Sequence, residues 1–174
     1  MGHRTVRHSP GGIVAGGELP THKTILVETD SQKEDRLLKD LDGLKKSILK
    51  AASGQESKAV LDADDSFNRL VGLMNGNSKN TMIQVHGMFA LGEIGSSESP
   101  LKGVACRKIL SVVFDKSLED KPDRNIIISA GVQALGSIAS VKSEAAQEAY
   151  AGLVKILDED LEYAASELKK RPAK

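Results

Sequence analysis

Apolar residues recur at spacings of three and four along most of the chain from Gln32 onward. This spacing gathers them on one side of an α-helix and leaves the intervening polar residues on the other side. The first run ends before Ser53 and Gly54, a pair typical of a helix stop. Its apolar positions are Leu37, Leu38, Leu41, Leu44, Ile48 and Leu49.

The same spacing predicts five further helices. The second is expected over about 57–75, before Gly76, and the third over about 80–95. Ser99 and Pro100 predict the start of the fourth, because serine caps helices and proline suits the first helical position. The other expected boundaries are Leu118 for the end of the fourth helix, Pro122 to Ser140 for the fifth, and a cap at Ser143 for the sixth, which runs to Lys170 either unbroken or bent near 158–160. The short connections predict that neighbouring helices are antiparallel.

Two parts of the chain match each other without a gap at an offset of 44 residues, as from Ile83 to Ile127. The matches fall on apolar, small and capping positions, whereas surface positions differ. A unit of this length holding two helices has the size of a helical repeat. The matched pairs include Gly87 and Gly131, Leu91 and Leu135, Ile94 and Ile138, Ala105 and Ala149, and Ile109, Leu110 and Val113 with Leu153, Val154 and Leu157.

The segments 89–95 (FALGEIG) and 133–139 (QALGSIA) resemble the A-L-G-x-I-G phrase of HEAT-like and armadillo-type helical repeats. The resemblance covers about 80–157 clearly and 33–76 weakly, and Ser96 stands where the family usually has Asp. It implies an all-α fold, a short α-solenoid of about three antiparallel helical hairpins. A closed six-helix bundle with two similar hairpins is the alternative.

Within these phrases, leucine and isoleucine are expected to face a partner helix. Gly92 and Gly136 are expected to let a neighbouring helix approach closely, because glycine inside a helix costs about 1 kcal/mol relative to alanine and needs a reason to be there.

The domain organisation follows from the change near residue 32 from a Gly- and Pro-rich segment to helical periodicity. Residues 33–170 are expected to form the repeat domain, and residues 1–32, rich in Gly and Pro, a flexible or extended arm. Part of residues 1–20 is a candidate leader segment. The β-like run 23–29 (KTILVET) has no sheet to join and is expected to extend along the helices or to be disordered.

Composition narrows the classes of partner. The 24 Lys and Arg residues balance 24 Asp and Glu, and the aromatic residues are two Tyr and three Phe, so neither phosphate binding nor base stacking is favoured. No apolar run approaches the roughly 20 residues that span a bilayer, and no secretory signal is recognisable. One cysteine cannot form an internal disulfide. We therefore expect a soluble, cytoplasmic protein with no nucleic-acid or membrane partner.

Candidate chemistry is weak at every place where it could be sought, so no catalytic, cofactor or metal site is predicted. His3, His8 and His22 lie in a segment that offers no fixed geometry. Cys106 is expected to be a half-buried structural thiol, and His86 to lie on a helix flank. Two further patterns fail: Asp62, Asp64 and Asp65 lack the Gly and Glu of a calcium loop, and Gly11, Gly12, Gly16 and Gly17 lack a phosphate-loop context. The acidic residues Asp158, Glu159, Asp160 and Glu162 are expected to be a solvated surface.

The resemblance implies that the second helix of each hairpin lines one binding face. We expect a protein–protein interaction or scaffolding module without catalytic activity, whose partner is another protein, with self-association through the ends of the stack as a further route. The alternatives are a HEAT-like enzyme or lyase-type subunit that binds a small ligand in a cleft, and a structural subunit of a larger assembly. The expected partner-binding residues are Asn68, Arg69, Arg107, Lys108, Ser111, Gln147, Glu148 and Lys155.

Overall fold

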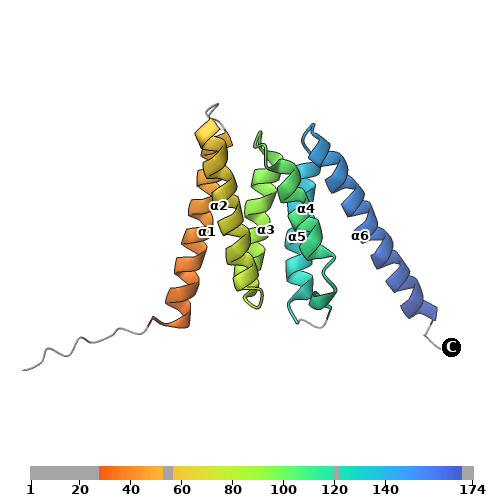
Figure 1. Cartoon of the computed structure of the whole chain (residues 1–174). Coiled ribbons are helices and arrows are strands. Elements are labelled where there is room, and N and C mark those ends of the chain that lie inside the picture. The colour runs from red at the N-terminus through yellow and green to blue at the C-terminus, as the bar shows by residue number, and fades with distance from the viewer. Residues whose placement is uncertain (1–27, 53–56, 120–121, 170–174) are drawn as a thin grey trace, which may run out of the picture.

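The computed structural model describes residues 28–52, 57–119 and 122–169, and most of them are α-helical (Figure 1). This confirms the prediction of an all-helical fold. Within these ranges the elements are α1 (Asp30–Ala52), α2 (Ser57–Gly76), α3 (Thr81–Ser96), α4 (Lys102–Val113), the short 3₁₀ helix η1 (Lys116–Leu118), α5 (Arg124–Ala139) and α6 (Glu144–Lys169).

Helix α1 begins at Asp30, earlier than the periodicity alone predicts. The Thr29 hydroxyl accepts a hydrogen bond from the Gln32 backbone N–H (3.2 Å), and the Thr29 N–H donates to the Gln32 side chain (3.0 Å). This reciprocal pair is a capping box, which satisfies two backbone donors at the helix start. Asn80 and Ser143 accept similar bonds, from Ile83 and Ala146, at the starts of α3 and α6.

Helix α4 is shorter at both ends than predicted. The Ser99 hydroxyl accepts from the Leu101 N–H (3.2 Å) and so stabilises a turn ahead of the helix, which starts at Lys102. At the other end, the Asp115 carboxylate accepts from the Ser117 N–H (2.8 Å) and starts η1. Such local side-chain bonds compete with helix continuation. The expected end at Leu118 is therefore wrong. By contrast, α6 is unbroken to Lys169, the first of its two predicted forms.

The helices lie in a row in which the chain runs up one helix and down the next (Figure 1). The helices α1, α3 and α5 form one layer, because α3 packs against both α1 and α5. Each is paired with the helix that follows it, and α4 also packs against α5 and α6. As a result, α1 and α6 lie at opposite ends of the row.

Hydrogen bonds and an ion pair join α3 to the helices around it. The Lys45 ammonium lies 3.0 Å from the Glu93 carboxylate, which joins α1 to α3. The Thr81 hydroxyl donates to the Asp123 carboxylate (2.6 Å) at the start of α5. The amide of Gln84, a buried side chain, donates to the Met74 carbonyl (2.7 Å) and so satisfies an acceptor at the end of α2.

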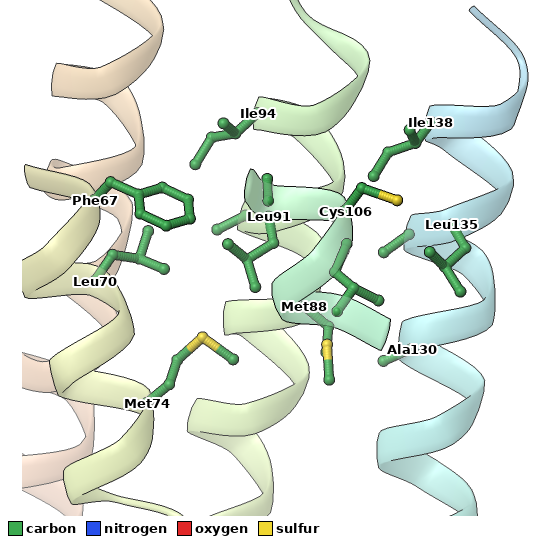
Figure 2. Close-up of a cluster of buried hydrophobic side chains, with 14 of the residues drawn as sticks. Phe67, Leu70, Met74, Met88, Leu91, Ile94, Cys106, Ala130, Leu135 and Ile138 are labelled. Carbon is green, nitrogen blue, oxygen red and sulfur yellow. The ribbon is translucent and has the colours of Figure 1, made fainter. Parts of the chain in front are cut away.

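The core is continuous across the row and is centred on α3 (Figure 2). Leu91 and Leu135, which match at the 44-residue offset, are both 0% exposed. Ile94 and Ile138 are also fully buried, so the predicted burial of these four positions is confirmed.

Of the matched glycines Gly92 and Gly136, only Gly92 has the closely packed neighbouring helix that the sequence predicts. A Cβ on Gly92 would lie 2.9 Å from the Ala134 Cβ and 3.0 Å from the Ala134 Cα, so α3 and α5 touch through their backbones here. A Cβ on Gly136 would meet nothing within 4 Å. The expected close neighbour of Gly136 is wrong, because none of the described helices lies against that side of α5.

The matched leucines should be equally costly to truncate. Leu91→Ala and Leu135→Ala should each lower the free energy of unfolding by about 2–5 kcal/mol, the usual result of emptying a fully buried leucine site. Urea denaturation followed by circular dichroism measures this change. Leu61→Ala is the control, because Leu61 is 69% exposed. A loss at Leu91 or Leu135 no larger than that at Leu61 would contradict their placement.

The matched glycines should respond with opposite signs. Gly92→Ala should destabilise by about 1–3 kcal/mol, since the α5 backbone has to move. Gly136→Ala should stabilise by about 0.5–1 kcal/mol, because alanine favours the helix and meets open space. The same urea titration reports both changes. Equal signs at the two positions would mean that α3 and α5 do not meet at Gly92 as described.

Candidate functional site

The eight predicted partner-binding residues lie on α2, α4 and α6. Six are exposed, and Lys108 and Glu148 are half-buried. Asn68 and Arg69 lie on α2, Arg107, Lys108 and Ser111 on α4, and Gln147, Glu148 and Lys155 on α6.

Several of these polar side chains are bound to neighbouring helices. Arg107 on α4 lies 3.6 Å from the carboxylate of Glu148 on α6, and the Lys108 ammonium donates to the Asn75 side chain on α2 (3.0 Å). The Ser111 hydroxyl donates to the Lys108 carbonyl of its own helix (2.8 Å). Exposed pairs of this kind contribute about 1 kcal/mol or less. The contacts of Arg107 and Lys108 join α4 to α6 and to α2, so these side chains are less available to a partner.

Lys155 is held in the same way. Its ammonium lies 4.3 Å from the centroid of the Phe114 ring and 3.9 Å from the Glu159 carboxylate. The first contact is a cation–π interaction, which anchors α6 to the segment that follows α4.

The most exposed apolar surface follows one side of α6. Tyr150 is 66% exposed, Val154 41%, Leu157 59% and Leu161 60%. Their spacing of four, three and four residues puts them on one side of the helix, along about three turns. We call these four residues the α6 seam. Val154 and Leu157 match Leu110 and Val113, which pack in or against the core, so the sequence did not predict that they are exposed.

The 44-residue offset relates this side of α6 to a side of α4 that packs against later helices. The α4 residues 44 positions before Tyr150, Val154 and Leu157 are Cys106, Leu110 and Val113. All three pack against the hairpin that follows them: the Cys106 thiol donates to the Ala145 carbonyl (3.7 Å), Leu110 lies against Gly152, and Val113 lies against Gly131. Tyr150, Val154 and Leu157 occupy the same positions on the α5–α6 hairpin, Leu161 extends their line, and none of the described residues covers these four side chains.

The opposite end of the row has a different character. Lys39 and Lys50 of α1 stand 44 positions before the buried Ile83 and Ile94 of α3 and are both exposed. Ser47, which stands 44 positions before Leu91, accepts a hydrogen bond from the Ser66 hydroxyl of α2 (3.2 Å). In repeat proteins a polar outer surface covers the end of a stack and keeps it in solution. The α1 end therefore resembles a covered end, and the α6 end does not.

The α6 seam is flanked by acidic side chains and is one helix wide. Asp158, Glu159, Asp160 and Glu162 are all exposed. On α5, the exposed residues Gly136 and Ser140 are small, and the exposed Ser129 and Gln133 line a hollow between α3 and α5.

A second apolar area lies between α3 and α5. Val85, Phe89 and Ile126 line a shallow hollow of about 360 Å³, with Phe89 40% and Ile126 54% exposed. A neighbouring hollow of about 450 Å³ extends to α1, and exposed His86 lies at its edge. The α6 seam has more exposed side chains in a regular line, and we take it as the principal candidate.

Cys106 is more buried than predicted. Its side chain is 0% exposed, and burial, followed by the charge of Glu148, raises the pKa of the thiol to about 11. A protonated and inaccessible thiol is a poor nucleophile, so Cys106 serves the packing of α4 on α6.

The other sequence candidates gain no partner chemistry. Asp62, Asp64 and Asp65 are exposed on α2. Among the residues that the structure describes, no three His, Cys, Asp or Glu side chains are grouped to hold a metal ion, and no helix is long and apolar enough to cross a membrane. His3, His8, His22, the glycines at 11, 12, 16 and 17, and most of the run 23–29 lie outside the described residues.

Comparison of the chain with protein-family models, with curated proteins and with solved structures gives no match.

Proposed function

We propose that residues 33–170 form a HEAT-like α-solenoid of three hairpins that acts as a protein-docking scaffold without catalytic activity of its own. The row of helices, the buried pairs Leu91 with Leu135 and Ile94 with Ile138, and the 44-residue offset support the repeat. A closed bundle would bring the first and last helices together, whereas α1 and α6 lie at opposite ends of the row.

The exposed α6 seam is the observation that carries the docking role. Four large apolar side chains in line, each 41–66% exposed, form a surface that water covers at a cost in free energy. Contiguous exposed apolar surfaces of this kind mark interaction sites in folded proteins. When a partner covers such a surface, a few side chains near its centre supply most of the binding energy.

The polar set on the second helices takes a supporting part in this proposal. Asn68, Arg69 and Gln147 are exposed and can make additional contacts with a docked protein, while Arg107 and Lys108 join α4 to α6 and α2. A structural subunit of a larger assembly would use the same surface. Which proteins cover it distinguishes the two roles.

The docking role can be tested by co-purification with a double variant. Leu157→Asp with Leu161→Asp places two charges in the α6 seam and should remove the proteins that co-purify with the tagged full chain, as measured by quantitative mass spectrometry. Because both leucines are about 60% exposed, circular dichroism should show an unchanged fold.

Leu61→Asp is the matched control, since Leu61 is an exposed leucine on α2 away from the seam. It should retain those proteins. If the double variant and the control retain the same set, the α6 seam is not a docking surface.

A further inference from the structure

The surroundings of the α6 seam define the chemistry of what covers it, an inference that rests on the docking role proposed above. α5 offers no line of large apolar residues that would extend the seam: Gly136 and Ser140 are exposed and small, and Ser129 and Gln133 line the hollow that α5 shares with α3. A second hairpin packed against both α5 and α6 would leave half of its apolar surface on polar residues. The geometry fits one helix laid along α6.

The spacing of the seam residues also indicates that the partner contacts them with a helix. Tyr150, Val154, Leu157 and Leu161 alternate at four, three and four residues, the average of 3.5 at which two helices remain in contact along their length. In the sequence the same spacing continues at Ala164 and Leu168, and α6 itself is continuous to Lys169. The helix is thus long enough to offer a partner several turns.

The charges beside the seam are mostly negative. Asp158 and Asp160 occupy the two positions that flank Leu157 and Leu161 in this pattern, and Glu159 and Glu162 lie close by, all exposed. Two cations lie near these carboxylates: Lys155 is shared between the Phe114 ring and Glu159, and Arg124 of α5 lines one hollow with Glu159 and Asp160. In paired helices the flanking charges select the partner, because opposite charges attract and like charges repel across the contact.

We propose that the α6 seam binds a single basic amphipathic helix of another protein, with leucine-like residues facing Leu157 and Leu161 and lysine or arginine facing Asp158 and Asp160. The apolar contact supplies affinity, and the acidic flanks select the sign of the partner's charge.

A second copy of this chain fits the seam less well, whether it presents α6 or α1. Two α6 helices would bring the same acidic residues to both sides of one contact. An α1 helix would offer the charges of Lys39 and Lys50 but no line of apolar residues to cover the leucines, because its outward positions are polar.

The test uses two synthetic helical peptides of about four heptads, each with leucine at the two apolar positions of every heptad. One peptide carries lysine and the other glutamate at the flanking positions. Fluorescence anisotropy with the full chain should give a dissociation constant at least tenfold lower for the lysine peptide. The difference should shrink in about 1 M salt, where charges are screened within about 3 Å.

A charge-reversed variant provides the decisive comparison. Asp158→Lys, Asp160→Lys and Glu162→Lys together should make the chain prefer the glutamate peptide. The matched control is Asp62→Lys, Asp64→Lys and Asp65→Lys on α2, which changes the net charge equally at exposed positions remote from the seam. The control should keep the preference for the lysine peptide, because the selecting charges are local.

Three outcomes would overturn the proposal. They are equal affinity for both peptides, or for neither; the same switch of preference in the seam variant and the α2 control; and a dimer in sedimentation that Leu157→Asp dissociates, which would make a second copy the occupant. If co-purifying proteins are lost from the seam double variant but the lysine peptide does not bind, the docking role stands and the basic helix is wrong.

Discussion

The contact between α3 and α5 at Gly92 and Ala134 sets the geometry of the whole row. Because a Cβ at Gly92 would lie 2.9 Å from that of Ala134, the two helices approach as closely as their backbones allow. At that separation the fully buried side chains of Leu91 and Leu135 lie within one core. The same approach brings α4 against both α5 and α6, where Val113 fills the space that Gly131 leaves. A larger residue at Gly92 would therefore disturb every later contact of the row.

Among the described residues no helix follows α6, so positions like those with which α4 packs on later helices are uncovered on α6. Cys106, Leu110 and Val113 show what these positions contact when a hairpin follows: a carbonyl oxygen and two glycines. Tyr150, Val154 and Leu157 stand at the same places on α6 and are 41–66% exposed. At the other end of the row the exposed positions of α1 are polar and include Lys39 and Lys50. The contrast between the two ends is the basis of the proposed docking role.

The features that were predicted correctly from the sequence are those set by residues close together along the chain. The starts of α3 and α6 follow from Asn80 and Ser143, whose side chains bond backbone N–H groups three residues away. The burial of Leu91 and Leu135 follows from helical spacing. The end of α4 was missed because the bond from Ser117 to Asp115 competes with the helix, and helical spacing does not reveal that competition. The exposure of Leu157 was missed for a different reason. Its sequence surroundings resemble those of Val113, and only the presence or absence of a following hairpin separates a buried residue from an exposed one.

The separation of the two end helices tests the central claim most directly. Spin labels attached to Lys39→Cys on α1 and Leu157→Cys on α6 report this distance by pulsed electron–electron double resonance. The native Cys106 stays unlabelled because it is 0% exposed. Neighbouring helices pack with axes 8–10 Å apart, and three such steps separate α1 from α6 in the row, so the account predicts a label distance longer than about 25 Å. A distance of about 10–15 Å, one helix step, would mean that α1 packs against α6 in a closed bundle. The seam would then be part of a core and not a docking surface.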